Sequence, residues 1–369
     1  MTHLVLVGGG HAHLSVLRRL AAARRPDVML TLVTPTVHQN YSGMLPGWMA
    51  GHYDLAKAQV DLRPLIAAAG ARLVEGRVVA LEASARRLRL ADGTVLAYDL
   101  LSLDVGSETD TTGLEEAGER LLPVKPLDDF FPAWSALLAE ACRRRAYRLA
   151  VVGGGAAGVE LALAATFAFA SQAPGAQVAL IVPATGLLPD HAPGVQARVE
   201  AYAGRAGLVV HRQRATGCAG GVRLADGRLL KFDKVIAATG ARPAAWVKAT
   251  DLAKDQQGYV LVNQHHCSLS HPEVFAAGDV CARTDVRMAR SGVHAVFAGP
   301  VLANNLLAAI DGGRLVAYKP KARSLYLLAC GPRYAIASWG RWSAEGAWVW
   351  RWKDWIDRGF VRRFSRSGQ

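Results

Sequence analysis

The 369-residue chain has few cysteines and no long apolar run without charges. Its five cysteines show no C-x-x-C spacing and no close pair, which argues against a disulfide framework and a structural zinc site. No second ligand pair accompanies the run from His265 to Cys267, so we expect no metal site. No run of about 18 uncharged apolar residues occurs, so we expect no transmembrane helix. A predicted strand begins by residue 4 and leaves no room for a signal peptide, which predicts a cytoplasmic protein.

Acidic residues are outnumbered by basic ones. Lys and Arg total 43 against 30 Asp and Glu, a net charge of +13. Such an excess favours an anionic partner: a membrane surface, a nucleotide cofactor or nucleic acid. Arginines spread over solvated helix faces explain the charge equally well. No recognised nucleic-acid-binding motif occurs, so we expect no nucleic-acid partner. A chain of this length can hold two or three domains.

The N-terminal stretch predicts a strand, a glycine turn and a helix. Residues 4–7 are apolar and read as a buried parallel strand, and apolar residues recur at helical spacing over 14–20. Between them, Gly8 permits a tight turn, and Gly10 lets a pyrophosphate approach the positive end of the helix. His13 stands where the usual G-x-G-x-x-G pattern has its third glycine. We therefore expect looser packing of this strand against its helix.

The same arrangement recurs later in the chain. Residues 150–160 repeat it with all three glycines, Gly153, Gly155 and Gly158. The second halves of the two units also match at a separation of 134 positions, as in Asp99 and Asp233 or Gly106 and Gly240. This internal repeat predicts two dinucleotide-binding units in an α/β fold.

The second strand of each unit lacks the acid that usually binds an adenosine ribose. The strand over 28–33 is followed by Thr34, and the strand over 177–182 by Pro183. The sequence therefore leaves NADH and NADPH both open. Further elements are predicted in the first unit: an irregular ligand-binding loop over 38–47, a helix over 61–69, a strand over 71–81, a hairpin over 87–96 and a strand over 100–106.

The last third returns to the first unit. A buried strand over 273–280 contains Gly278 and Asp279, whose carboxylate can accept hydrogen bonds from a ribityl chain. A helix from Ser291 to Leu307 should aim its N-terminus at the same ligand. Six of the nine tryptophans lie between Trp339 and Trp355. A helix over 348–364 would carry an apolar stripe, which fits either an interfacial membrane helix or packing on the protein body.

These motifs resemble the two-dinucleotide-binding-domain flavoproteins of the pyridine nucleotide–disulfide oxidoreductase superfamily. Residues 5–10, 237–240 and 275–279 match its three signatures in order. The chain is similar to type II NADH dehydrogenases and, more closely still, to the flavoprotein module joined to selenide, water dikinase. The features shared with that module are His11-Ala12-His13, residues 41–47, 124–126, 299–303 and 352–358.

The resemblance implies two Rossmann-like domains of the glutathione-reductase type and a small C-terminal α+β region. It places an FAD-binding domain over 1–124 and 255–312, an NAD(P)-binding domain over 125–254, and the C-terminal region, with its amphipathic helix, over 313–369. The residues implied for FAD are Gly8, Gly10, His11, Ala12, Thr34, Met44, Leu45, Pro46, Val79, Gly106, Lys125, Gly278, Asp279, Gly292 and Val293. Those implied for NADH or NADPH are Gly153, Gly155, Gly158 and Gly240, with Glu160 as an acid near the nicotinamide and the acceptor.

The resemblance thus predicts an enzyme that passes a hydride from NAD(P)H to FAD and electrons on to an acceptor, with a quinone the first candidate. Two alternatives stay open. A sulfide- or selenium-compound:quinone oxidoreductase would need two cysteines flanking the flavin, for which Cys142, Cys281 and Cys330 have no supporting spacing. A flavin-bound regulatory protein with little turnover would fit the missing ribose acids. A homodimer and peripheral contact with the inner face of the membrane also stay open.

Overall fold

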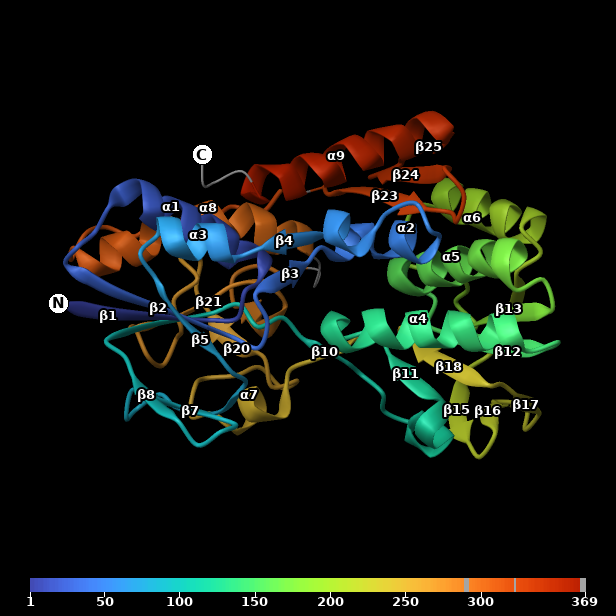
Figure 1. Ribbon diagram of the computed structural model, residues 1–369, viewed down its shortest axis with the longest axis horizontal. Helices are drawn as coiled ribbons and strands as arrows, with labels where there is room; N and C mark the ends of the chain where they lie inside the picture. The colour runs from blue at the N-terminus through green and yellow to red at the C-terminus, as the bar shows by residue number, and fades with distance from the viewer. Residues whose placement is uncertain (289–291, 322, 366–369) are drawn as a thin grey trace.

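The computed structural model describes residues 1–288, 292–321 and 323–365 and contains two five-stranded parallel sheets lying side by side (Figure 1). The first sheet has the order β21 (Val274–Ala276), β9 (Leu100–Leu103), β1 (Thr2–Val7), β2 (Val28–Thr34) and β5 (Arg72–Glu75). The second has the order β11 (Leu121–Pro123), β18 (Lys234–Ala237), β12 (Tyr147–Val152), β13 (Ala176–Val182) and β14 (Val209–Arg212). The predicted fold class is confirmed.

Residues 4–7 of strand β1 are apolar and buried, because both faces of the sheet are covered there. Leu4 and Leu6 pack in one core with α1 (His11–Ala23) and α8 (Gly292–Ile310). Val5 and Val7 face a second core with the three-stranded antiparallel sheet. That sheet consists of β6 (Val78–Glu82), β7 (Arg87–Leu90) and β8 (Val95–Ala97).

The internal repeat is visible in the hydrogen bonds. Asp99 precedes β9, donates its N–H to the carbonyl of His3 and accepts the N–H of His3 at 2.7 Å. Asp233 precedes β18 and makes the same two bonds to Arg148, with the carboxylate contact at 2.8 Å. Each aspartate therefore fixes the register of a later strand against the first strand of its unit, which confirms the prediction of two matching units.

Helices cover the second sheet in the same manner. They are α4 (Leu127–Arg143), α5 (Ala156–Gln172) and α6 (Pro193–Arg205), and a short antiparallel sheet adds β15 (Ala215–Cys218), β16 (Gly221–Leu224) and β17 (Leu229–Lys231). Residues 121–123, which the sequence places in the FAD-binding domain, form β11 and pair with β18 of the second sheet. The domain boundaries themselves stay a prediction.

The prediction of an irregular loop over 38–47 is wrong. The segment forms β3 (His38–Asn40), the 3₁₀ turn η1 (Ser42–Met44) and α2 (Leu45–Met49). Pro46 supplies the fixed φ that suits a first helical turn. Gly47 lets the Tyr53 ring pack on α2, since a Cβ at Gly47 would lie 2.4 Å from that ring.

Other boundaries also shift. The strand predicted over 71–81 is two strands, β5 and β6, separated at Gly76 and Arg77. The helix predicted over 61–69 is shorter: Asp61 ends β4 (Gln59–Asp61), and α3 (Arg63–Ala68) follows. The Asp61 carboxylate accepts the N–H of Arg63 at 3.0 Å, so it lies outside the helix. The hairpin over 87–96 is confirmed.

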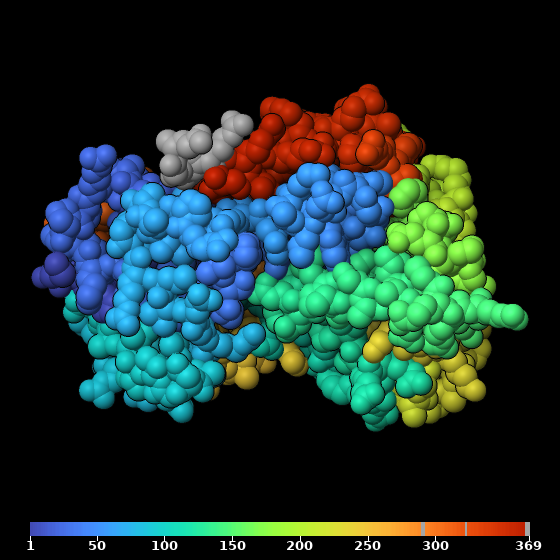
Figure 2. Space-filling model, in the orientation of Figure 1, coloured from blue at the N-terminus to red at the C-terminus, as the bar shows by residue number. Residues whose placement is uncertain are grey.

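The C-terminal region lies across both units. It comprises β23 (Leu325–Ala329), β24 (Ala335–Trp339), β25 (Trp342–Gly346) and α9 (Ala347–Ser365). Helix α9 runs along the top of the molecule, in contact with its own sheet and with β4 of the first unit (Figures 1 and 2). Its buried face contains Trp350 and Val361, while Trp348 and Trp355 are exposed. The predicted stripe is therefore divided: Trp348 and Trp355 face solvent, whereas Phe360 stacks on Tyr41 with 4.4 Å between ring centroids.

Among the described helices, α8 alone is long and apolar enough, by length and composition, to cross a membrane. The sequence-based expectation of no transmembrane helix did not take this helix into account. In the structure α8 packs along α1, and Ala298, Leu302 and Leu306 are buried there. This is the setting of a core helix. The predicted helix start at Ser291 lies outside the described residues.

Candidate functional site

The first glycine loop is built around a buried carboxylate. Asp104, at the end of β9, accepts the N–H groups of Ala12 at 2.7 Å and His13 at 3.0 Å. A Cβ at Gly8 would lie 2.4 Å from the Asp104 carbonyl, and one at Gly10 2.4 Å from its carboxyl carbon. The two glycines are thus required by Asp104 itself, before any ligand is considered.

Asp104 fills part of an anion-binding position. Burial raises its pKa to about 7, although the two N–H donors favour the charged form. Gly278 also approaches it, with a Cβ there 2.8 Å from Oδ1. Asp104 was not predicted from the sequence, because 92 residues separate it from Ala12 and no local pattern connects the two.

His13 replaces the third glycine with a fully buried ring. Its Nδ1 lies 2.6 Å from the Gly8 carbonyl and its Nε2 2.8 Å from the Ser102 hydroxyl. Burial lowers its pKa to about 4, so the ring is neutral, donating to the carbonyl and accepting from the hydroxyl. The space expected between strand and helix is therefore occupied by a hydrogen-bonded side chain.

The second glycine loop is open by comparison. A Cβ at Gly153 would lie 2.2 Å from the Ala238 carbonyl, and one at Gly158 2.0 Å from the Gly153 carbonyl. Gly155 precedes α5, a Cβ there would meet nothing within 4 Å, and no side chain caps the helix. Ala238 stands where the first unit has Asp104, so the start of α5 is free to accept a pyrophosphate.

A second pair of predicted residues meets beside the first loop. Lys125 donates from Nζ to Asp279 Oδ2 at 2.6 Å and to the Ser107 hydroxyl at 3.2 Å. Lys125 comes from the segment that enters α4, and Asp279 from the turn η4 (Gly278–Val280) after β21. The structure therefore places Lys125, which lies between the two sheets in the chain, against Asp279, the acid predicted to hold the ribityl chain.

His11 forms one wall of this region. Its ring lies 5.5 Å, between centroids, from both Tyr41 and Phe360, and a Cβ at Gly292 would lie 3.8 Å from its Nε2. Burial lowers the pKa of His11 to about 4, and Nε2 is buried with no hydrogen-bond partner in the described structure. A buried polar atom without a partner beside Gly292 fits a bound polar ligand such as FAD.

A charged cluster lies beside Tyr41, in which Asp357 is buried and Lys353 and Glu160 are mostly covered. Lys353 of α9 donates to the Gly43 carbonyl at 2.6 Å and to Asp357 Oδ2 at 2.7 Å. The Tyr41 hydroxyl donates to Asp357 Oδ1 at 3.3 Å. Glu160 of α5 accepts the N–H of Ala329 at 2.8 Å. The cluster thus joins both units through the C-terminal helix.

The charges in this cluster act on one another. Burial raises the pKa of Glu160 to about 7, with Lys353 opposing the shift. Burial also disfavours the charge on Lys353, but Asp357 and Glu160 outweigh it and raise the lysine pKa. Glu160 was predicted from the sequence, whereas Lys353, Asp357 and Tyr41 were not. The lysine and aspartate at i and i+4 among the tail tryptophans were the available signal.

The remaining predicted residues occupy varied settings, and their contacts with a cofactor stay predictions. Thr34 is buried at the end of β2 and donates to the Thr36 carbonyl at 3.0 Å. Val79 is exposed at a bulge in β6. Of the side chains predicted to border the flavin ring, Met44, Leu45 and Pro46 are buried and Val293 is half-buried. Gly106 follows β9, Gly240 follows β18, and both have positive φ.

The cysteines are separate free thiols. Cys281 is buried, with Sγ 3.4 Å from the Ala276 carbonyl, and Cys142 is exposed on α4. Burial, together with Glu160, raises the pKa of the Cys330 thiol. Among the described residues, no group of three or more His, Cys, Asp or Glu side chains could hold a metal ion. His266, in the run considered for metal binding, has its Nδ1 2.9 Å from the Ala276 carbonyl oxygen.

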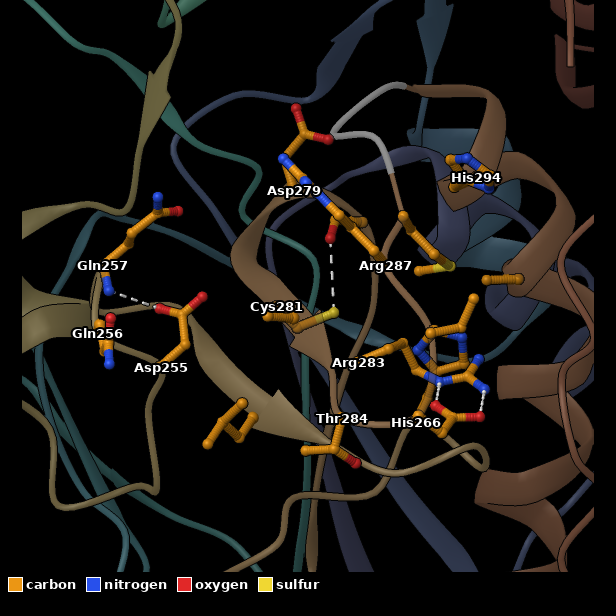
Figure 3. Close-up of a pocket in the computed structure, with 17 residues that line it drawn as sticks. Asp255, Gln256, Gln257, His266, Asp279, Cys281, Arg283, Thr284, Arg287 and His294 are labelled. Carbon is orange, nitrogen blue, oxygen red and sulfur yellow. Dashed lines mark hydrogen bonds and ion pairs between the residues drawn. The ribbon is translucent and has the colours of Figure 1, made fainter.

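A cavity of about 600 Å³ opens beside Asp279. Figure 3 shows Arg287 and His294 on the side of Asp279, and Gln256 and Gln257 across from them. Of the residues predicted to bind FAD, only Gly278 and Asp279 line this cavity. It therefore adjoins the predicted cofactor groove rather than coinciding with it.

Comparison with known proteins gives a consistent result. The sequence profile of the pyridine nucleotide-disulphide oxidoreductase family matches residues 2–299. An NADH dehydrogenase-like protein of Mycobacterium tuberculosis is 28% identical over 303 residues, 76% of this chain and 73% of the relative. The sulfide:quinone oxidoreductase of Aquifex aeolicus superposes with a TM-score of 0.80 at 15% identity, covering 100% of this chain and 92% of that one. NDH2 of Plasmodium falciparum, solved with NADH, gives 0.79 at 13%, with 99% of each chain covered. These two structures share the fold.

Proposed function

Because this chain belongs to the pyridine nucleotide-disulphide oxidoreductase family and is an FAD-dependent NAD(P)H oxidoreductase, we propose that its electron acceptor is a quinone. FAD, when bound, would accept a hydride from NAD(P)H and pass two electrons on to the acceptor. The residues of the two glycine loops would hold FAD and the nicotinamide cofactor by their adenosine and pyrophosphate parts. The choice of acceptor then depends on groups that lie beyond those loops.

The observation that carries the proposal is the buried cluster of Glu160, Lys353, Asp357 and Tyr41. A quinone needs two protons with its two electrons, whereas an iron–sulfur protein takes electrons alone. A carboxyl group with a pKa of about 7 can hold a proton at neutral pH and release it. Lys353 stabilises the carboxylate that remains, and Asp357 holds Lys353 against the Gly43 carbonyl. This set of groups supports proton-coupled reduction of a small acceptor.

The C-terminal region supplies a surface suited to a membrane that contains the quinone. Trp339 and Trp355 are 55% and 68% exposed, and Trp342 and Trp348 are about half exposed. Basic side chains alternate with them on the same helix and hairpin, including Arg351. Exposed tryptophan beside arginine is typical of a peripheral helix at the lipid headgroups. We call the exposed Trp339, Trp342, Trp348 and Trp355 with Arg351 the ridge. We therefore propose that the ridge makes reversible contact with the inner face of the membrane, while the opposite face of α9 packs on the body.

The other functions receive less support. Sulfide chemistry needs an accessible thiolate, and the burial that raises the pKa of Cys330 works against one. A regulatory protein without turnover gives no reason to bury a charged cluster beside the predicted flavin position. An acidic iron–sulfur protein would suit the net charge of +13, and it enters the test below as the competing acceptor.

The test compares acceptors with and without a proton requirement. FAD-loaded protein is supplied with NADH and either a water-soluble quinone, ferricyanide or a ferredoxin. We expect Glu160→Gln to lower quinone reduction at least tenfold while ferricyanide reduction stays within twofold, because loss of a general acid typically costs about 10²–10⁴-fold. Glu140→Gln, on the exposed face of α4, is the matched control. Equal effects on both acceptors, or a clear preference for ferredoxin, would overturn the quinone assignment.

A further inference from the structure

The adenosine end of the second unit lacks its usual acid but has another one nearby. Strand β13 ends at Val182 and is followed by Pro183. The Gly186 N–H donates to the Pro183 carbonyl at 2.9 Å, so the chain turns directly above the strand. A Cβ at Gly154 would lie 2.7 Å from the Gly186 carbonyl, which places this turn against the second glycine loop.

Glu200 reaches this turn from α6. Its Oε1 lies 3.9 Å from the point where a side chain on Gly186 would begin. Its Oε2 accepts from Arg212 Nη2 at 2.5 Å. Arg212 ends β14 and is paired in register with Val182, so it stands beside the end of β13. The acid and the arginine thus flank the position where the adenosine ribose lies in a dinucleotide-binding unit.

We infer that Glu200 supplies the missing acid and makes the enzyme selective for NADH. One carboxylate oxygen faces the turn and can accept a ribose hydroxyl, while Arg212 holds the other oxygen and orients the group. Arg212 is a positioning residue in this arrangement. The inference rests on the NAD(P)H oxidoreductase activity and is independent of the quinone assignment.

The same carboxylate opposes NADPH. A 2′-phosphate at this position would replace the hydroxyl with about two negative charges close to Glu200. Binding it would require Arg212 to leave Glu200, which would leave the carboxylate unpaired beside the phosphate. Like charges at short range are unfavourable even at a partly exposed site. Glu200 is about one-third exposed and Arg212 about half exposed, so the discrimination should be moderate.

The experiment measures binding of the adenosine half alone. FAD-loaded protein is titrated calorimetrically with ADP-ribose and with 2′-phospho-ADP-ribose, and flavin reduction by NADH and NADPH is followed in parallel. We expect wild type to favour ADP-ribose by about tenfold or more, the range of one charge-assisted hydrogen bond. Glu200→Gln should weaken ADP-ribose several-fold and tighten 2′-phospho-ADP-ribose.

A second variant separates charge from geometry. Arg212→Gln should weaken both probes, whereas a merely structural loss would appear equally in thermal stability and FAD content. Arg212→Lys should restore part of the ADP-ribose affinity. Glu140→Gln again serves as control, because its pair with Arg144 is an exposed glutamate–arginine pair of the same unit.

Each outcome decides a different point. A wild-type preference for 2′-phospho-ADP-ribose, or unchanged selectivity in Glu200→Gln, would overturn the inference while leaving the enzyme activity intact. If neither nucleotide reduced the flavin but ADP-ribose binding followed the expected pattern, the oxidoreductase activity would fail and the role of Glu200 would stand. Absence of binding by both probes would overturn the role of Glu200, and absence of flavin reduction as well would overturn the activity too.

Discussion

Changing Asp104 to Asn is the most direct test of how the first unit holds FAD. The wild-type carboxylate and the FAD pyrophosphate both use the start of α1, and Asp104 already accepts two of its N–H groups. A pyrophosphate beside an ionised Asp104 would be repelled, so the protonated acid is the form compatible with FAD. FAD binding should therefore take up a proton. Asparagine keeps the shape and one acceptor oxygen but cannot ionise.

The size of the effect follows from the raised pKa. With a pKa of about 7 in the FAD-free protein and a higher value with FAD bound, affinity falls as pH rises above 7. The loss can reach about tenfold, or about 1.4 kcal/mol, for each pH unit until the higher pKa is passed. Stability shifts in the same direction. The stabilisation from the raised pKa is fully present below about pH 4, and about 4 kcal/mol of it is lost as pH rises to 7.

The assay is recovery of flavin fluorescence on dissociation, measured between pH 6 and 9. Wild type should bind FAD progressively more weakly across this range, while Asp104→Asn should show a nearly flat profile and the tighter binding at pH 9. Asp92→Asn, in the exposed hairpin turn after β7, controls for loss of a carboxylate elsewhere. Parallel pH profiles for wild type and Asp104→Asn would refute the reasoning.

Three further changes test the second unit, the charged cluster and the ridge. Gly155→Val should slow flavin reduction by NAD(P)H at least tenfold with FAD retained, because the added side chain occupies the open approach to α5; unchanged stopped-flow rates would contradict this. Lys353→Met should raise the apparent pKa of Glu160 and move the alkaline limit of quinone reduction to higher pH, as read from a pH–rate profile. An unmoved profile would show that Lys353 does not act on the group that limits quinone reduction. Replacing Trp348 and Trp355 with Ser should abolish co-sedimentation with anionic vesicles at low salt without loss of FAD. Wild type that ignores vesicles at every salt concentration would rule out the membrane contact.

Much of the fold could be predicted because its signals are local. Glycines between an apolar strand and a helix, and the Asp-Gly turns, specify their own backbone within a few residues. The 134-residue repeat then placed Asp99 and Asp233 in equivalent positions. Helix α2 was missed because its stability depends on Tyr53 packing against Gly47, which periodicity does not reveal. The face of α9 was missed because a helix with apolar residues on several sides is oriented by its partners.

The site was predictable where one motif contributes several atoms and unpredictable where a single distant side chain completes it. Gly8, Gly10 and Asp279 lie in recognisable patterns. Asp104 reaches the first glycine loop from the end of β9, and Glu200 reaches the turn after β13 from α6. In the first unit the Asp104 carboxylate occupies the start of α1, and in the second we propose that Glu200 replaces the missing ribose acid. Departures from a signature were therefore useful guides to where the structure compensates.

The buried charges of α9 indicate why the C-terminal helix closes over the site. Its packing face is apolar at Val349 and Trp350 and again at Val361 and Phe364, with Lys353 and Asp357 between them. A buried ion pair seldom stabilises a protein more than well-packed apolar residues of the same volume. The pair therefore gains little as a stabilising contact. Lys353 instead connects the Gly43 carbonyl of the first unit with the field at Glu160 of the second, and it can do so only while α9 is seated across both. The helix thus couples assembly of the two units to the electrostatics around Glu160.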